Sequence, residues 1–388
     1  MMLRHCPIPL GPDALMALAR AQTGIAIDDE AAREPLTVLH RSISEQGGLH
    51  EAGALAQQAK LLRLLKNRLR MQRDFTAHPE IAEQDIPRPL FVVGFARTGT
   101  TKTQKTLAAT GDFNFLPFWK AFNPALHSGN RSESPQARID EAEAYCTWFD
   151  AQSPLTRTGH AFETHEPEEE TTLTEHCLVA PSFIGFSDAP EYLGWMATQP
   201  PTILFEFLRD TLKYLQWQGL AVPGRKWLLK APTYYGLEEA ILGVFPDADF
   251  VMTHRSPLQT VPSSCRLIDL FRMPFGTAPV DVGALVGGFT MMMDLHIANR
   301  ERLAGLRVLD LAFTDVTRNM ASVAERIYAH CGLEWNARSR AAIAAWEANH
   351  PQHGHGTFTY ALEDYGLTES GILRDFAAYE AMRRRVAG

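Results

Sequence analysis

Residues 90–101 read LFVVGFARTGTT, a short apolar run followed by a loop with a glycine at each end. The run at 90–93 has no polar alternation, which is typical of a strand buried on both faces of a parallel sheet. Beyond the loop, a helix is predicted from Thr100 to about Thr110, where Gly111 ends it. The stretch therefore predicts the strand, loop and helix of an α/β fold.

The loop has the spacing of phosphate-binding loops, with four residues between Gly94 and Gly99. Glycines let the backbone approach an anion closely, and the amides and dipole of a helix start then hold it. The hydroxyls of Thr98, Thr100 and Thr101 add donors. A strand–helix turn that binds no ligand is the alternative interpretation.

The loop departs from that of nucleotide triphosphatases at one position. Those proteins carry a lysine after the second glycine, which reaches the β- and γ-phosphates, followed by a Ser or Thr that holds Mg²⁺. Here Thr100 takes the place of the lysine, and the cation is Arg97, two residues before Gly99. We therefore expect a donor without a γ-phosphate and without a metal. A P-loop kinase or triphosphatase, or a non-catalytic nucleotide-binding protein, remains the alternative function.

Three later apolar runs predict further strands, at residues 227–229, 250–252 and 307–311. A helix is expected over 236–244, between the first two. Together these elements predict a P-loop-like α/β fold of three layers, in which helices flank a central, mostly parallel sheet.

The chain divides into two regions by pattern. Residues 1–86 read as an N-terminal helical extension, and residues 87–388 as the α/β domain. Residues from about 112 to 225 are rich in Pro, acidic and aromatic residues. They predict an insertion of helices and long loops within the domain.

The composition of the 388 residues is that of a globular protein, with 45% hydrophobic and 21% charged residues. The net charge of −8 disfavours a nucleic-acid partner, and no apolar run is long enough for a membrane span. The five cysteines are scattered, which indicates free thiols in a reducing compartment. With no signal-peptide pattern at the N-terminus, we expect a cytoplasmic protein.

Four segments resemble those of sulfotransferases that use 3′-phosphoadenosine 5′-phosphosulfate (PAPS). Residues 89–101 resemble the loop for the 5′-phosphosulfate, in the form that bacterial members use. Residues 250–264, FVMTHRSPLQTVPSS, resemble the site for the 3′-phosphate. Residues 226–232, KWLLKAP, and 355–367, HGTFTYALEDYGL, resemble a strand and a C-terminal segment of the family. The resemblance covers roughly residues 60–380.

This resemblance implies transfer of the sulfuryl group from PAPS to a hydroxyl or amine of a small, partly apolar acceptor, with release of PAP. It implies that Arg255 and Ser263 bind the 3′-phosphate and that no metal is required. It also places the insertion at about 112–225 on the acceptor side, and it is compatible with a homodimer.

The residue types around Arg255 suit a phosphate. The guanidinium can hold two phosphate oxygens at once. Pro257 is typical of the first position of a helix, which would bring the hydroxyl of Ser263 back to the site two turns later. Because Pro262 lacks an amide donor and is unfavourable inside that helix, Ser264 stays an alternative to Ser263.

Sulfuryl transfer is expected to resemble phosphoryl transfer, an in-line displacement helped by positioning and charge. Lys230 at a strand end and Arg97 are the candidates for neutralising charge on the leaving phosphate, together with the amides near Gly99. An exposed lysine without this role is the alternative for Lys230.

The general base is less well defined. Family members often carry a histidine two or four residues after the strand lysine, but this chain has Pro232 and Tyr234 there. His165 and Glu166 are the candidates, because they resemble a His-Glu pattern of the bacterial subgroup.

The same acidic stretch has other interpretations. Glu169 and Glu170 lie a few residues downstream, and glutamates at a helix start are also favoured by the helix dipole alone. A metal cluster with His176 is disfavoured because no fixed ligand spacing appears.

Three further features remain. One has no assigned role, and the other two have two interpretations each. The histidines at 350, 353 and 355 predict a surface loop or a loop near the nucleotide rather than a metal site, and Lys102 has no assigned role. Aromatic and methionine side chains predict either core or an apolar acceptor pocket. They are Phe113, Phe115, Phe118, Trp119, Phe122 and Met291 to Met293.

Overall fold

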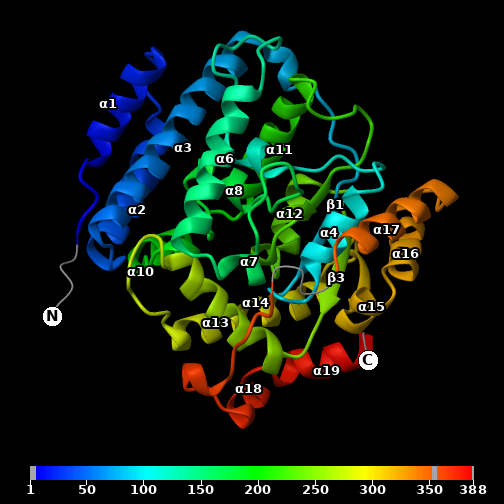
Figure 1. Ribbon diagram of the computed structural model, residues 1–388. Helices are drawn as coiled ribbons and strands as arrows, with labels where there is room; N and C mark the ends of the chain where they lie inside the picture. The colour runs from blue at the N-terminus through cyan, green and yellow to red at the C-terminus, as the bar shows by residue number, and fades with distance from the viewer. Residues whose placement is uncertain (1–5, 352–355, 387–388) are drawn as a thin grey trace.

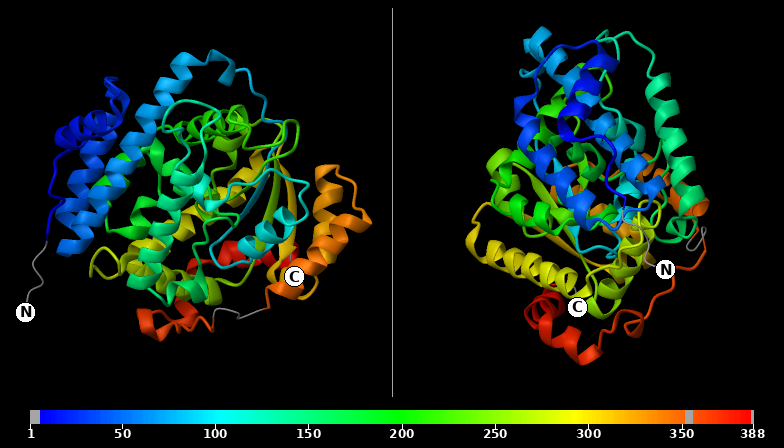
Figure 2. Two further views of the ribbon diagram at one scale, coloured as in Figure 1. Left: turned by 45° about the horizontal axis from the view of Figure 1, so that its top comes forward. Right: turned by 90° about the vertical axis from the view of Figure 1, so that its left-hand side faces the viewer.

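The computed structural model describes residues 6–351 and 356–386 and shows helices arranged around a small sheet (Figures 1 and 2). Within these residues, no helix is both long and apolar enough to cross a membrane.

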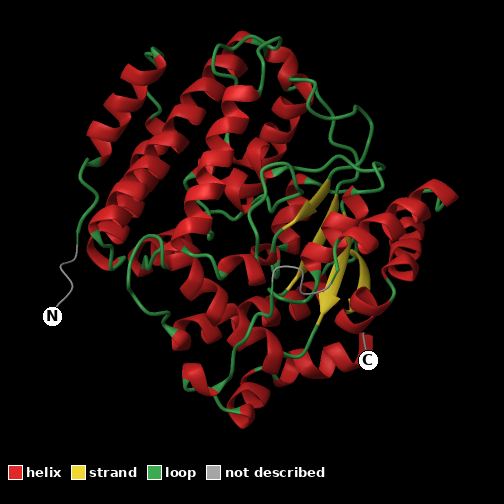
Figure 3. Cartoon of the chain, in the orientation of Figure 1, coloured by secondary structure: helices red, strands yellow, loops and turns green. Residues whose placement is uncertain are grey.

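The sheet has four parallel strands in the order β2-β1-β3-β4 (Figure 3). They are β1 (Leu90–Gly94), β2 (Leu228–Lys230), β3 (Asp249–His254) and β4 (Arg307–Ala312). All the strands predicted from sequence are therefore confirmed. Because every strand runs the same way, the carboxyl ends of β1, β2 and β3 open at one edge of the sheet. At that edge lie the loop at residues 94–101, called the phosphate loop below, Lys230 and Arg255.

Side chains of β1 alternate between two cores, which makes the fold three layers deep. Leu90 and Val92 point into one core, and Phe91 and Val93 point into the larger one. The first core lies under α4 (Thr100–Ala108), α15 (Phe313–Arg318), α16 (Met320–Cys331) and α17 (Ala337–Asn349). The second lies under α11 (Thr202–Trp217), α12 (Glu238–Val244) and α13 (Pro257–Arg272). The predicted α/β class is confirmed.

The helices before the sheet are α1 (Pro12–Thr23), α2 (Glu30–Gln46) and α3 (Glu51–Ala77), followed by a short 3₁₀ turn, η1 (Pro79–Ile81). They stand at the left of Figure 1, on the other side of the molecule from α16 and α17. Buried leucines of α3, such as Leu61 and Leu64, belong to the same core as Phe91. The N-terminal helices are thus packed onto the α/β body.

Helices of varied length and loops fill the chain between α4 and β2. They are α5 (Phe118–Phe122), α6 (Gln136–Gln152), α7 (Thr156–Gly159), α8 (Thr171–Thr174), η2 (Glu175–Cys177), α9 (Phe183–Phe186), α10 (Pro190–Met196) and α11. The remaining elements are η3 (Pro232–Tyr234), α14 (Val282–Arg302), η4 (Glu363–Tyr365), α18 (Glu369–Asp375) and α19 (Ala377–Val386). The last two pack below α14 in Figure 1, and α14 and α19 are in contact.

Candidate active site

The phosphate loop is fastened to β3 by two threonine hydroxyls. Thr98 Oγ1 donates to the carbonyl of Phe95 over 2.6 Å and lies 2.6 Å from Thr253 Oγ1. A Cβ on Gly94 would lie 2.3 Å from Thr253 Oγ1 and 2.7 Å from Thr98 Oγ1. No side chain fits there without moving these groups, so Gly94 is required by the close approach of β1 and β3. Thr98 is buried and holds the loop in shape.

The first amides of the helix that follows the loop are not capped by any described side chain. Gly99 is the N-cap of α4 at φ 96°, and no side chain caps the first amides. Arg97 also has a positive φ of 72°, which costs a non-glycine residue about 1 kcal/mol or more. Amides and dipole at the start of α4 can therefore hold an anion, with the hydroxyl of Thr101 beside them.

Arg97 links the loop to both neighbouring segments. Its Nη1 donates to the carbonyl of Gly159, and its Nε donates to Ser263 Oγ over 3.3 Å. The guanidinium carbon lies 5.1 Å from the centre of the Phe358 ring. Burial lowers the pKa of Arg97, but an arginine starts far enough above neutrality to stay charged.

Arg255 touches the phosphate loop directly. Its Nη1 donates to the carbonyl of Arg97 over 3.0 Å, and its Nε donates to Gln259 Oε1 over 2.8 Å. Its guanidinium carbon lies 4.2 Å from the centre of the Phe313 ring, and Nη2 lies 3.4 Å from the hydroxyl of Tyr360. The two anion sites inferred from sequence are therefore adjacent, on neighbouring strands.

The helix α13 orients the two candidate serines differently. It starts at Pro257 and continues through Pro262 to Arg272 without ending at the internal proline. Ser264 Oγ donates to the carbonyl of Thr260 over 2.8 Å, which turns it into the helix. Ser263 Oγ is the one that meets Arg97, so it faces the phosphate loop.

Lys230 lies at the end of β2, fully buried beside the loop. Its Nζ is 2.6 Å from Glu169 Oε1 and 3.4 Å from Thr101 Oγ1. Its backbone N–H donates to Glu170 Oε2 over 2.7 Å. Burial raises the pKa of Glu170 well above its usual range, and Glu170 Oε1 has no hydrogen-bond partner among the described residues.

A histidine that the sequence analysis did not single out joins this group. His160 Nε2 lies 3.1 Å from Glu168 Oε1, and the preceding carbonyl, of Gly159, accepts from Arg97. Burial acts to raise the pKa of Glu168, but the charge and hydrogen bond of His160 outweigh it and lower the pKa to about 2. The only signal in the sequence is a lone histidine eight residues before an acidic run, which is too common to identify a site.

One donor atom each from His160, Glu168 and Glu169 lies within 4.8 Å of the others, which is the spacing of a possible metal site. Glu168 is already paired with His160, and Glu169 with Lys230. A cation there would have to displace the lysine.

The structure places His165 and Glu166 apart from Lys230. His165 is exposed, and Glu166 Oε2 lies 3.8 Å from Lys105 Nζ, which pairs more closely with Glu163. No hydrogen bond or ion pair of the described residues joins either of them to Lys230, Arg97 or the loop.

The remaining polar candidates lie elsewhere. Lys102 pairs with Glu347 over 2.8 Å. His176 is buried against the carbonyl of Leu173, and His350 stacks on Trp346 with ring centres 4.4 Å apart. The histidines at 353 and 355 lie outside the described residues.

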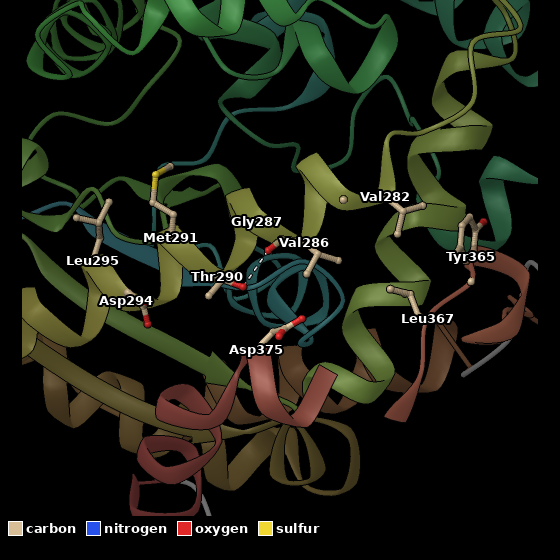
Figure 4. Close-up of a pocket in the computed structure, with 12 residues that line it drawn as sticks. Val282, Val286, Gly287, Thr290, Met291, Asp294, Leu295, Tyr365, Leu367 and Asp375 are labelled. Carbon is tan, nitrogen blue, oxygen red and sulfur yellow. Dashed lines mark hydrogen bonds between the residues drawn. The ribbon is translucent and has the colours of Figure 1, made fainter. Parts of the chain in front are cut away.

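The apolar candidates divide between core and surface. Phe118 and Phe122 pack into an aromatic cluster with Tyr145 and Phe162. Met291 is 59% exposed in an open groove of about 1070 Å³ along α14, which Leu367 and Asp375 flank from the C-terminal region (Figure 4). Phe113 lies in the opposite core, against Tyr328.

Residues 89–337, more than half of the chain, match the model of the Sulfotransferase family. The chain therefore belongs to the sulfotransferase family and is an enzyme of sulfuryl transfer. The likeness extends to sulfotransferase STF1 from Mycobacterium tuberculosis H37Rv, with a TM-score of 0.78 and 25% identity over 97% of this chain and 100% of that one. Sulfotransferase STF9 from Mycobacterium avium shares the fold, with a TM-score of 0.82 and 24% identity over 96% of each chain. No curated protein matches the chain significantly.

Proposed function

We propose that this sulfotransferase takes its sulfuryl group from PAPS, passes it to a hydroxyl or amine of a small, partly apolar acceptor, and releases PAP. The observation that carries the proposal is the 3.0 Å hydrogen bond from Arg255 to the backbone of Arg97. It makes two anion sites neighbours, as a nucleotide with a 5′-phosphosulfate and a separate 3′-phosphate requires.

Each end of the donor has its own set of groups. The amides of Thr100 and Thr101, with Arg97, bind the 5′-phosphosulfate. Arg255 binds the 3′-phosphate through its two-pronged guanidinium, and Ser263 donates its hydroxyl. The hydroxyl of Tyr360, which lies 3.4 Å from Arg255 Nη2, is beside the same site. The donor supplies the sulfuryl group, and the protein supplies position and charge.

Lys230 and Arg97 stabilise the charge that develops on the leaving 5′-phosphate. Lys230 Nζ is within reach of Thr101 on the loop, and its buried position makes the charge effective because little water screens it. In the free protein Glu169 is its counter-ion. The donor's anion takes over that role when it binds.

For the general base, the contacts favour His160 over the pair His165 and Glu166. Glu168 accepts from His160 Nε2, which leaves Nδ1 as the basic nitrogen, and both side chains are at most 10% exposed. The His160 ring also packs on Phe162 and Phe271, so it borders an apolar region suited to an acceptor. His160 then removes the proton of the acceptor hydroxyl as the oxygen attacks sulfur.

Two measurements test the donor assignment. In thermal melting, PAP without Mg²⁺ should stabilise the protein by about 2.7 kcal/mol at a hundredfold excess over its Kd, and ATP with Mg²⁺ should do little. Mass spectrometry of hydroxyl compounds incubated with PAPS should then reveal an added SO₃ group. Stabilisation by ATP with Mg²⁺ alone would indicate a kinase or triphosphatase, and PAP binding without any transfer would indicate a non-catalytic nucleotide-binding protein.

A further inference from the structure

A second cavity, of about 460 Å³, lies along α3. One wall is made of small side chains of α3, among them Ala56 and Ala59, and the facing wall holds Phe122, Tyr145 and Trp148. The ring centres of Tyr145 lie 4.8 Å from Phe122 and 5.7 Å from Trp148. A slot with an aliphatic wall, which Leu55 shares with the alanines, and an aromatic wall suits a flat apolar molecule, and its size is that of small-molecule sites.

Two cations line the same cavity. The side chain of Lys60 is 7% exposed and is paired with Glu175 over 2.5 Å. The guanidinium of Arg63 donates to the carbonyl of Phe122 and lies 3.8 Å from the centre of that ring. Within residues 6–351 and 356–386, Arg63 forms no salt bridge with a carboxylate. The lysine has a carboxylate paired directly with it, whereas Glu175 and Glu141 attract the arginine only from beyond salt-bridge distance.

The carboxylates of Glu175 and Glu141 attract Arg63 but form no salt bridge with it, and the groups in direct contact with Arg63 carry no negative charge. Burial raises the pKa of Tyr145, so its phenol keeps its proton. Burial also lowers the pKa of His176, whose Nε2 lies 3.5 Å from Arg63, so that ring is neutral. Burial lowers the pKa of Arg63 itself to about 10, which leaves it charged at neutral pH. A half-buried positive charge without a directly paired carboxylate can still gain from a bound anion.

We propose that this cavity binds a small amphipathic anion, an aromatic or otherwise flat apolar body that carries one carboxylate or sulfonate. The body lies between α3 and the rings of Tyr145 and Trp148, and the anionic head pairs with Arg63. The site goes beyond the sulfuryl-transfer function and does not rest on it.

The cavity is separated from the reaction centre by one layer of rings. Phe162 lies 6.5 Å from Tyr145, on the cavity side, and 4.9 Å from His160 on the other, measured between ring centres. The bound molecule and the donor nucleotide therefore occupy different places, so saturating PAP is expected to leave the cavity free.

The test uses two fluorescent probes on the full chain saturated with PAP: anilinonaphthalene sulfonate, which is anionic, and phenylnaphthylamine, which has a similar body without charge. Ala56→Trp fills the slot and should weaken both probes by at least about tenfold. Arg63→Met removes the charge and should weaken only the sulfonate, by about 10- to 100-fold, as expected for a charge-assisted hydrogen bond. Ala298→Trp, an exposed alanine of α14, is the matched control and should change neither.

Thermal melting and PAP affinity establish that each variant is folded. Three results would overturn the proposal: probe binding that is unchanged in Ala56→Trp, which would place the probe elsewhere, such as the groove along α14; displacement of the sulfonate by PAP; or equal weakening of both probes by Arg63→Met. Loss of PAP binding in the unaltered protein would instead count against the proposed donor and leave the cavity result standing.

Discussion

Lys230→Met separates the role of the lysine in turnover from its role in binding. Methionine keeps most of the length of the side chain and removes the charge that lies 2.6 Å from Glu169 and 3.4 Å from Thr101. Loss of one preorganised charge at a developing anion lowers kcat by about 10²- to 10³-fold, or about 2.7–4 kcal/mol. PAP affinity should fall by only about tenfold, because Arg97 and the helix amides still hold the 5′-phosphate.

The same substitution leaves Glu169 without its partner. The Glu169 side chain is 17% exposed, so water can solvate part of the abandoned charge. The cost in stability should therefore be about 1–3 kcal/mol, below the 3–5 kcal/mol of a fully buried broken pair. Adding Glu169→Gln to Lys230→Met should recover most of that stability and none of the turnover.

The assays are turnover with an acceptor found by mass spectrometry, calorimetric titration with PAP, and thermal melting of the single and double variants. If PAP affinity drops as far as kcat, Lys230 acts in ground-state binding. If kcat stays within about threefold of the unaltered enzyme, the assignment of Lys230 to the leaving group is wrong.

Four further substitutions test other parts of the site. Arg255→Ala should raise the Kd of PAP by about 10- to 100-fold with little change in kcat at saturating donor, and a selective loss of kcat would refute the 3′-phosphate role. His160→Gln should lower kcat by about 10²- to 10⁴-fold, whereas Glu166→Gln should change it less than about threefold; the reverse ranking would return the base to Glu166. Burial raises the pKa of Glu170, so its carboxyl favours folding fully below the ordinary pKa and loses that effect as pH rises through the folded pKa. The melting temperature of Glu170→Gln should therefore gain on that of the unaltered enzyme with rising pH, and parallel curves would contradict this.

The sheet could be predicted, and the donor side of the site could be proposed, because their signals are local. The apolar run before Gly94 is typical of a buried strand, and the glycine spacing is typical of a tight loop with a helix after it. Arg255 and Ser263 lie within one strand–helix unit, so eight residues of sequence define their relation. Because of Pro262, the sequence did not indicate which serine faces the phosphate loop. The course of α13 past the proline shows that it is Ser263.

The acceptor side could not be predicted in the same way. Glu168, Glu169 and Glu170 are consecutive, yet each has a different partner, His160, Lys230 and the backbone of β2. Those partners come from segments that are distant in sequence. The acidic run itself does not indicate which carboxylate contacts which partner. His160 in turn lies in an irregular stretch whose position depends on long-range packing rather than on periodicity.

The hydroxyl contact between Thr98 and Thr253 has a consequence for how nucleotides compete. In the proposed donor site it ties the two phosphate subsites to one frame before any ligand arrives, so a molecule that engages one subsite presents its second phosphate to the other at high effective concentration. Inorganic phosphate, or an adenosine monophosphate with a single phosphate, can occupy only one subsite and gains none of that advantage. On this proposal, discrimination among nucleotides depends on the distance between the two phosphate subsites.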